Sequence, residues 1–146
     1  MPPSRQRTCQ LAVPARPASV DAILDLVQSL WTEPADFPAK DQTRFETALI
    51  EVAGNIVRHA AGTSASRDTT IELTLTVAPG YAAASFRDNG GAADLDLANV
   101  TMPDPTEESG RGLPLTRALA DVLTYDRVGS TNIWTLICRR TNAPPP

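Results

Sequence analysis

The sequence has few of the residues that build metal centres and nucleophilic triads. Its 146 residues include one histidine, His59, and two cysteines, Cys9 and Cys138. A single histidine excludes multi-histidine metal sites and leaves no convincing Ser-His-Asp arrangement. The cysteines lie near opposite ends of the chain and form no C-x-x-C motif. We therefore expect two buried free thiols, with one long-range disulfide as the alternative.

Positive charge and long apolar runs are also scarce. Seventeen acidic residues against thirteen basic ones give a net charge of −4, which argues against electrostatically driven binding to nucleic acid. The only lysine, Lys40, follows alanine rather than glycine, so the chain lacks a phosphate loop of the G-x-x-x-x-G-K-[ST] type. No apolar run is long enough for a membrane span, and no signal-peptide core is present. A cytoplasmic protein without membrane contact is predicted.

The length favours one domain. Both ends of the chain are rich in proline, which cannot donate a hydrogen bond to a strand ladder. We therefore predict a single domain over residues 7–140, with flexible termini at 1–6 and 141–146.

Hydrophobic periodicity predicts three helices, over residues 19–31, 41–61 and 113–122, the first with Ser19 as its N-cap. It also predicts five strands, over 7–13, 70–77, 81–87, 123–128 and 132–138. Strict alternation of apolar and polar residues in the second strand is typical of antiparallel sheets. The element order indicates an α/β fold, a two-layer α/β sandwich whose helices gather on one face of a mixed, mostly antiparallel sheet.

Three polar side chains on the second predicted helix share one stripe. Glu51, Asn55 and Arg58 are spaced at i, i+4 and i+7, beside the apolar stripe that faces the core. Together they could supply a base, an oxygen ligand for Mg²⁺ and a phosphate clamp. The alternative interpretation is an exposed polar helix face with no such role.

Two glycine-containing segments follow. Asp88-Asn-Gly90 comes directly after a predicted strand, where an aspartate could accept a hydrogen bond from a ligand while the backbone approaches closely; a plain turn is the alternative. The segment Gly110-Arg111-Gly112-Leu113 opens a helix, and such an N-terminus favours phosphate. The irregular stretch from Asp88 to Gly112 is long enough to indicate a functional loop or lid.

In this order the three segments resemble the GHKL-type ATP-binding domain, known as the Bergerat fold. Glu51…Asn55…His59 is similar to its asparagine box, Asp88-x-Gly90 to its first glycine box, and Gly110-x-Gly112-Leu113 to its second. The form Glu-x-x-x-Asn-x-x-x-His-Ala and the short lid from Asp94 to Ser109 resemble the RsbW/SpoIIAB-type anti-sigma factor serine kinases. The chain departs from the pattern at Ala92, where the first glycine box has glycine or proline, and at Pro114. The late-strand threonine of the family has two candidates, Thr131 and Thr135.

The resemblance implies a serine-protein kinase that uses ATP and Mg²⁺, with Asn55 as the metal ligand and Asp88 as the acceptor for the adenine amino group. Glu51 would accept or orient the proton of the substrate serine. The nucleotide would also be held by a set of residues from all three segments: Arg58, Gly90, Ala92, Gly110, Arg111, Gly112 and Leu113. His59 is interpreted as packing at the helix end.

The partners implied by the resemblance are a sigma factor and a small anti-anti-sigma protein of the STAS type. In the family these proteins exchange places on the kinase, which is called partner switching. The ATP- or ADP-bound protein, a homodimer in the family, binds the sigma factor, and phosphorylation of the anti-anti-sigma protein, its antagonist, releases that antagonist. The alternative is a nucleotide-dependent anti-sigma or adaptor module without significant kinase activity.

Overall fold

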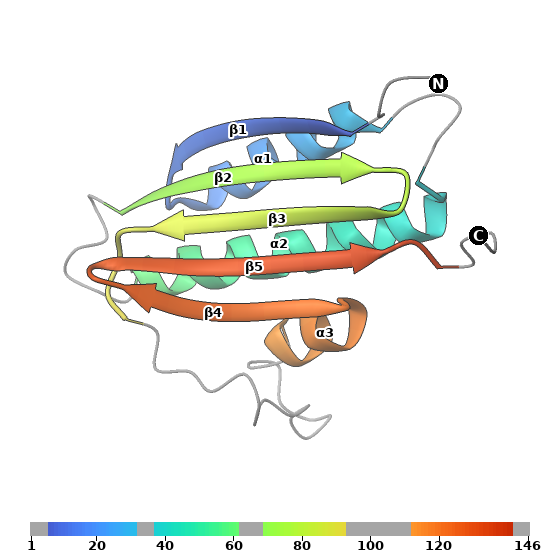
Figure 1. Ribbon diagram of the computed structural model, residues 1–146. Coiled ribbons are helices and arrows are strands. Elements are labelled where there is room, and N and C mark those ends of the chain that lie inside the picture. Colours follow the sequence, from blue (N-terminus) through green and yellow to red (C-terminus); the bar gives the residue numbers. More distant parts are fainter. Residues whose placement is uncertain (1–5, 32–36, 62–68, 93–111, 142–146) are drawn as a thin grey trace, which may run out of the picture.

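The computed structural model describes residues 6–31, 37–61, 69–92 and 112–141. In this part of the chain, one face of a five-stranded sheet is covered by a layer of helices (Figure 1). The strands are β1 (Arg7–Pro14), β2 (Thr70–Ala78), β3 (Tyr81–Asp88), β4 (Val122–Val128) and β5 (Thr131–Arg139). The helices are α1 (Pro17–Leu30), α2 (Ala39–Ala61) and α3 (Gly112–Leu119). The predicted two-layer α/β sandwich is confirmed.

The strand order is β1-β2-β3-β5-β4, and each neighbouring pair is antiparallel. The described sheet is therefore wholly antiparallel rather than mixed. Tight hairpins account for two of these pairs: Pro79-Gly80 joins β2 to β3, and Gly129, with a φ of 62°, joins β4 to β5. The register between β3 and β5 places the end of β3 beside the start of β5, because Asp88 pairs with Asn132.

The core lies between the sheet and α2. The predicted apolar stripe of α2 is confirmed, since each of its members is at most 3% exposed: Phe45, Ala48, Leu49, Val52, Ile56 and Ala60. The alternation predicted for β2 is confirmed as well, because Ile71, Leu73, Leu75 and Val77 are all buried. No helix in the described ranges is long and apolar enough to cross a membrane.

Several predicted helix boundaries differ from the structure, two of them for clear physical reasons. Ser19 is not the N-cap of α1, because the helix begins at Pro17, whose fixed φ suits a first helical position. The buried Ser19 hydroxyl instead donates a hydrogen bond to the carbonyl of Pro14 at 2.6 Å. The third helix ends at Leu119 rather than at 122, since Val122 already pairs with Ile137 in the sheet.

A buried carboxylate joins the start of α2 to the end of β5. The Asp41 side chain has no exposed surface and accepts hydrogen bonds from the backbone N–H (2.9 Å) and the hydroxyl (3.0 Å) of Thr141. Arg44 lies 3.5 Å from Asp41 and donates a hydrogen bond to the Leu119 carbonyl at 2.9 Å. Thr141 falls in the segment predicted as flexible, but this cluster ties it to the domain and also holds the C-terminus of α3.

Asp41→Asn is expected to lower the free energy of unfolding by about 1–2 kcal/mol, because the amide keeps one acceptor but places a donor against the donors of Thr141. Urea denaturation followed by circular dichroism measures the change. Asp21→Asn, at an exposed position on α1, is the control and should leave the midpoint unchanged. An unaltered midpoint for Asp41→Asn would show that the Asp41 carboxylate does not stabilise the fold.

Both cysteines are free thiols, as predicted, although only Cys138 is fully buried and Cys9 is half-buried. Cys9 lies on the edge strand β1, which the helices cover only in part. Desolvation raises the pKa of the Cys138 thiol to about 11, and burial also raises the pKa of Cys9. The thiolate is the reactive form, so a raised pKa makes both groups less reactive at neutral pH.

A Cys9→Ser variant should therefore react with a thiol reagent at pH 8 many times more slowly when folded than when unfolded in urea. The thiol that remains, Cys138, is buried in the folded protein and almost wholly protonated at that pH. The release of the chromophore over time measures the rate. Equal rates in the two states would contradict the placement of Cys138 in the core.

Candidate functional site

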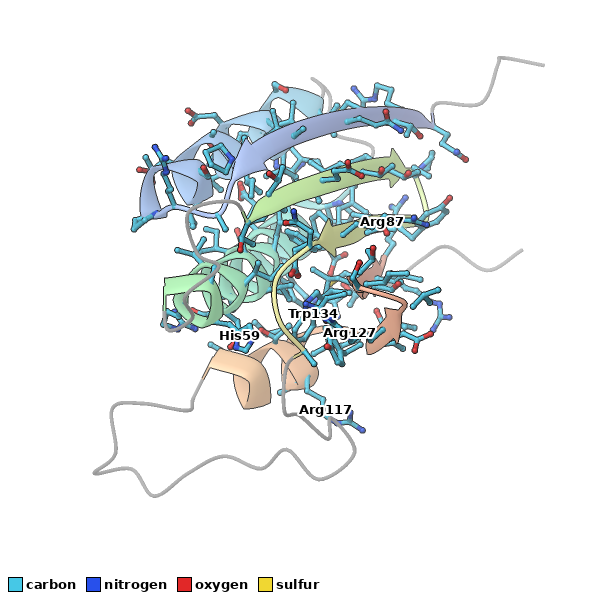
Figure 2. The ribbon with its side chains drawn as sticks, turned by 90° about the vertical axis from the view of Figure 1, so that its left-hand side faces the viewer. His59, Arg87, Arg117, Arg127 and Trp134 are labelled. Atoms are coloured by element: carbon cyan, nitrogen blue, oxygen red, sulfur yellow. The ribbon has the colours of Figure 1, made fainter. Side chains whose placement is uncertain are left out.

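The described site residues gather at the end of the sheet where β3 finishes and β5 begins. Figure 2 looks onto this end and shows His59 of α2 and Arg127 of β4 there, whereas Arg117 of α3 points away. The His59 Nε2 atom lies 3.0 Å from the Gly91 carbonyl and donates a hydrogen bond to it. The last turns of α2 therefore lie against the turn that contains the first glycine box, and the interpretation of His59 as a packing residue agrees with this contact.

Asp88 is the buried acid of the site. Strand alternation places it on the helix-facing side with Phe86, and only 4% of its surface is exposed. Its Oδ1 atom accepts two hydrogen bonds, from the Gly90 N–H at 3.0 Å and from the Asn132 Nδ2 at 2.9 Å. Within the described ranges no group donates to Oδ2. Oδ1 therefore accepts hydrogen bonds from within the fold, and Oδ2 is left as an acceptor for another group.

Gly90 lies in a closely packed part of this turn. A Cβ atom there would lie 3.0 Å from the Asp88 Oδ1 and 3.4 Å from the Thr69 Cγ2. Any larger residue would push against the carboxylate itself. Gly90 is buried, whereas Gly91 and Ala92 are exposed, so alanine at the third position of the glycine box meets no crowding.

Glu51 and Asn55 lie half-buried on α2. Neither side chain makes a hydrogen bond or ion pair within the described residues. Because His59 is one turn beyond Asn55 and contacts Gly91, the stripe Glu51, Asn55 and His59 faces the turn after β3. Arg58 is exposed, and its guanidinium lies back along the helix over Gly54, where a Cβ atom would be 3.2 Å from it.

Helix α3 runs antiparallel beside α2 (Figure 1). Its C-terminal carbonyl, Leu119, is held by Arg44, and its eight residues rise about 12 Å. The same rise along α2 leads from Arg44 to the neighbourhood of Glu51. The N-terminus of α3, at Gly112, is therefore directed toward the C-terminal half of α2. Gly110, Arg111 and the predicted lid from Asp94 to Ser109 lie outside the described residues.

Asn132 is a residue of this site that the sequence analysis missed. Strand alternation places the two candidates for the late-strand threonine, Thr131 and Thr135, on the other face of β5 from Asn132. Asn132 faces the helices in phase with the buried Trp134, and it is 1% exposed. That phase is visible in the sequence, since Trp134, Leu136 and Cys138 alternate with polar or β-branched residues.

A second missed group surrounds Asn132. Its Oδ1 accepts hydrogen bonds from the Tyr125 hydroxyl and from the Arg127 guanidinium at 2.8 Å. Its Nδ2 donates to the Gly91 carbonyl at 2.9 Å as well as to Asp88. Arg127 also donates to the Gly90 carbonyl at 3.1 Å. The β4–β5 hairpin therefore holds the glycine-box turn.

The described residues contain no group of three or more His, Cys, Asp or Glu side chains placed to hold a metal ion. A metal at this stripe would depend on fewer protein ligands, such as the amide oxygen of Asn55, and on oxygens of the molecule bound with it.

Sequence and structure comparisons identify the class of domain. The family model described as the histidine kinase-like ATPase domain matches residues 13–138, so the chain belongs to that family, whose domain binds a nucleotide. The fold is similar to that in the crystal structure of the RsbU and RsbW domains of Rv1364c from Mycobacterium tuberculosis, with a TM-score of 0.65 and 16% identity over 92% of this chain. The chain spans 32% of that protein's chain. A search of curated proteins finds no match. The resemblance to a GHKL-type ATP-binding domain is confirmed, and the fold is similar to that of an RsbW domain.

Proposed function

We propose that the chain is an anti-sigma factor with serine-protein kinase activity, which uses Mg-ATP to phosphorylate a STAS-type anti-anti-sigma protein. The observation that carries this proposal is the arrangement of the Asp88 carboxylate. A buried acid with one oxygen fixed by Gly90 and Asn132, and the other left as an acceptor, suits an amino group on a flat apolar base. The missing side chain of Gly90 lets the turn pack closely around this carboxylate.

Glu51 and Asn55 are proposed to serve the phosphate end of the same ligand. Asn55 offers a neutral oxygen ligand for Mg²⁺, which would neutralise phosphate charge when bound. Glu51, one turn earlier on the same stripe, would accept or orient the proton of the substrate hydroxyl. Arg58 would have to turn from its position over Gly54 to contact a phosphate. The segment from Gly110 to Leu113, at the start of α3, would hold the phosphates through backbone N–H groups.

The proposed biological role is partner switching. The nucleotide-bound protein, as a homodimer, would hold a sigma factor until an unphosphorylated antagonist competes for it, and serine phosphorylation of the antagonist would restore the sigma complex. Support for this role is the family and the RsbW-like fold.

The test is a pair of measurements on the purified chain. Calorimetry with ATP, with and without Mg²⁺, measures binding, and radiolabelled ATP with a STAS-domain protein encoded beside the gene measures transfer to serine. We expect Mg²⁺-dependent binding and a labelled partner. Absence of ATP binding would contradict the whole proposal. Binding without transfer would favour the alternative, a nucleotide-dependent anti-sigma or adaptor module.

A further inference from the structure

We propose that Arg127 is a positioning residue for base selection, acting through Asn132 on the carboxylate of Asp88. The proposal rests on the proposed nucleotide site and names residues that determine which purine it accepts. Arg127 itself would touch no ligand. Its role would be to hold the Asn132 amide, which in turn orients the Asp88 carboxylate.

The first step concerns the amide of Asn132. An asparagine amide has a donor end and an acceptor end of nearly equal shape, so its neighbours decide which end points where. The Tyr125 hydroxyl can donate or accept and does not decide. Arg127 can only donate, whereas the Asp88 carboxylate and the Gly91 carbonyl can only accept, so together they turn Oδ1 toward Arg127 and Nδ2 toward Asp88.

The second step concerns the carboxylate. Asn132 Nδ2 and the Gly90 N–H both donate to the same oxygen of Asp88, Oδ1. The other oxygen, Oδ2, therefore remains an acceptor in a defined direction. A 6-amino purine presents a donor to such an oxygen, whereas a 6-oxo purine presents an acceptor, which is unfavourable in a buried site.

The third step concerns the turn that carries the acid. Arg127 donates to the Gly90 carbonyl, and Asn132 donates to the Gly91 carbonyl. These bonds tie the backbone on both sides of Gly90 to the β4–β5 hairpin. Loss of the guanidinium would remove one donor to Asn132 and the bond to the Gly90 carbonyl together, so the amide and the turn would both be held less firmly and the direction of Oδ2 would be less strictly fixed.

The experiment compares the affinities of ATP and inosine triphosphate, which differ at the 6-position of the purine, by calorimetry. Arg127→Met removes the donors and keeps the length of the side chain. We expect the preference of the wild-type protein for ATP to fall by roughly tenfold in this variant, mainly through weaker ATP binding. Arg87→Met is the matched control, because Arg87 is exposed on the opposite face of the sheet, and it should keep the wild-type preference.

Tyr125→Phe is a milder variant that keeps the ring contact with Trp134 and removes one of the two donors to Asn132. It should lower the preference for ATP by a smaller factor, and it replaces Arg127→Met if that variant does not fold. Equal weakening of both nucleotides, with the preference kept, would show that Arg127 has only a structural role and would overturn the inference. A wild-type protein that binds neither nucleotide would overturn the proposed function as well.

Discussion

Replacing Asp88 by asparagine should weaken ATP binding by roughly 10- to 100-fold, the effect of one mismatched buried hydrogen bond. The geometry of the site decides which end of the new amide faces the ligand. Gly90 N–H and Asn132 Nδ2 both donate to one oxygen of Asp88, so the carbonyl oxygen of the asparagine takes that position. The NH₂ group then replaces Oδ2 and places a donor against the donor of the adenine amino group.

The fold should survive this substitution, because the two hydrogen bonds to Gly90 and Asn132 are kept. Calorimetry with ATP and Mg²⁺ measures the loss, and Asp25→Asn, at an exposed position on α1, is the matched control. Inosine triphosphate provides a second control, since its 6-oxo group accepts a hydrogen bond and should bind the variant no more weakly than the wild type. Unchanged ATP affinity would remove Asp88 from the base-binding site.

Much of the fold could be predicted because its signals are local. The apolar stripe of α2 and the alternation of β2 each reflect a helix or strand with one buried face, and such periods are visible in a single sequence. The boundaries were less accurate where a neighbouring element decides them. Ser19 has the chemistry of an N-cap, but the helix already begins at Pro17. The Ser19 hydroxyl donates a hydrogen bond to the Pro14 carbonyl instead.

The candidate site could be predicted only in part, because some of its contacts are local in sequence and others are not. Asp88 and Gly90 are two residues apart, and the turn that joins them is local. Asn132 lies 44 residues beyond Asp88, and their contact depends on the register between β3 and β5, which the sequence does not specify. A family pattern that expects threonine directed attention to Thr131 and Thr135, which face the other side of the sheet.

Glu51→Gln should separate phosphoryl transfer from nucleotide binding. Glutamine keeps the size and the helix preference of glutamate, and the Glu51 carboxylate makes no hydrogen bond or ion pair with the described residues. Neither α2 nor the Asp88 turn should therefore change. General-base catalysis contributes about 10²- to 10⁴-fold, so transfer to a STAS-type partner should fall by that factor while ATP affinity stays nearly constant.

The matched control is Glu46→Gln, on the same helix, where the carboxylate accepts a hydrogen bond from Gln28 of α1 at 3.1 Å. It removes the same charge from α2 and should leave transfer at the wild-type rate. Single-turnover transfer of radiolabelled phosphate, measured beside a binding titration, distinguishes the outcomes. Wild-type transfer in Glu51→Gln would exclude Glu51 as the base. Loss of transfer and ATP affinity together would instead assign Glu51 to the nucleotide pocket, because a group that acts only on the substrate hydroxyl does not affect binding of ATP alone.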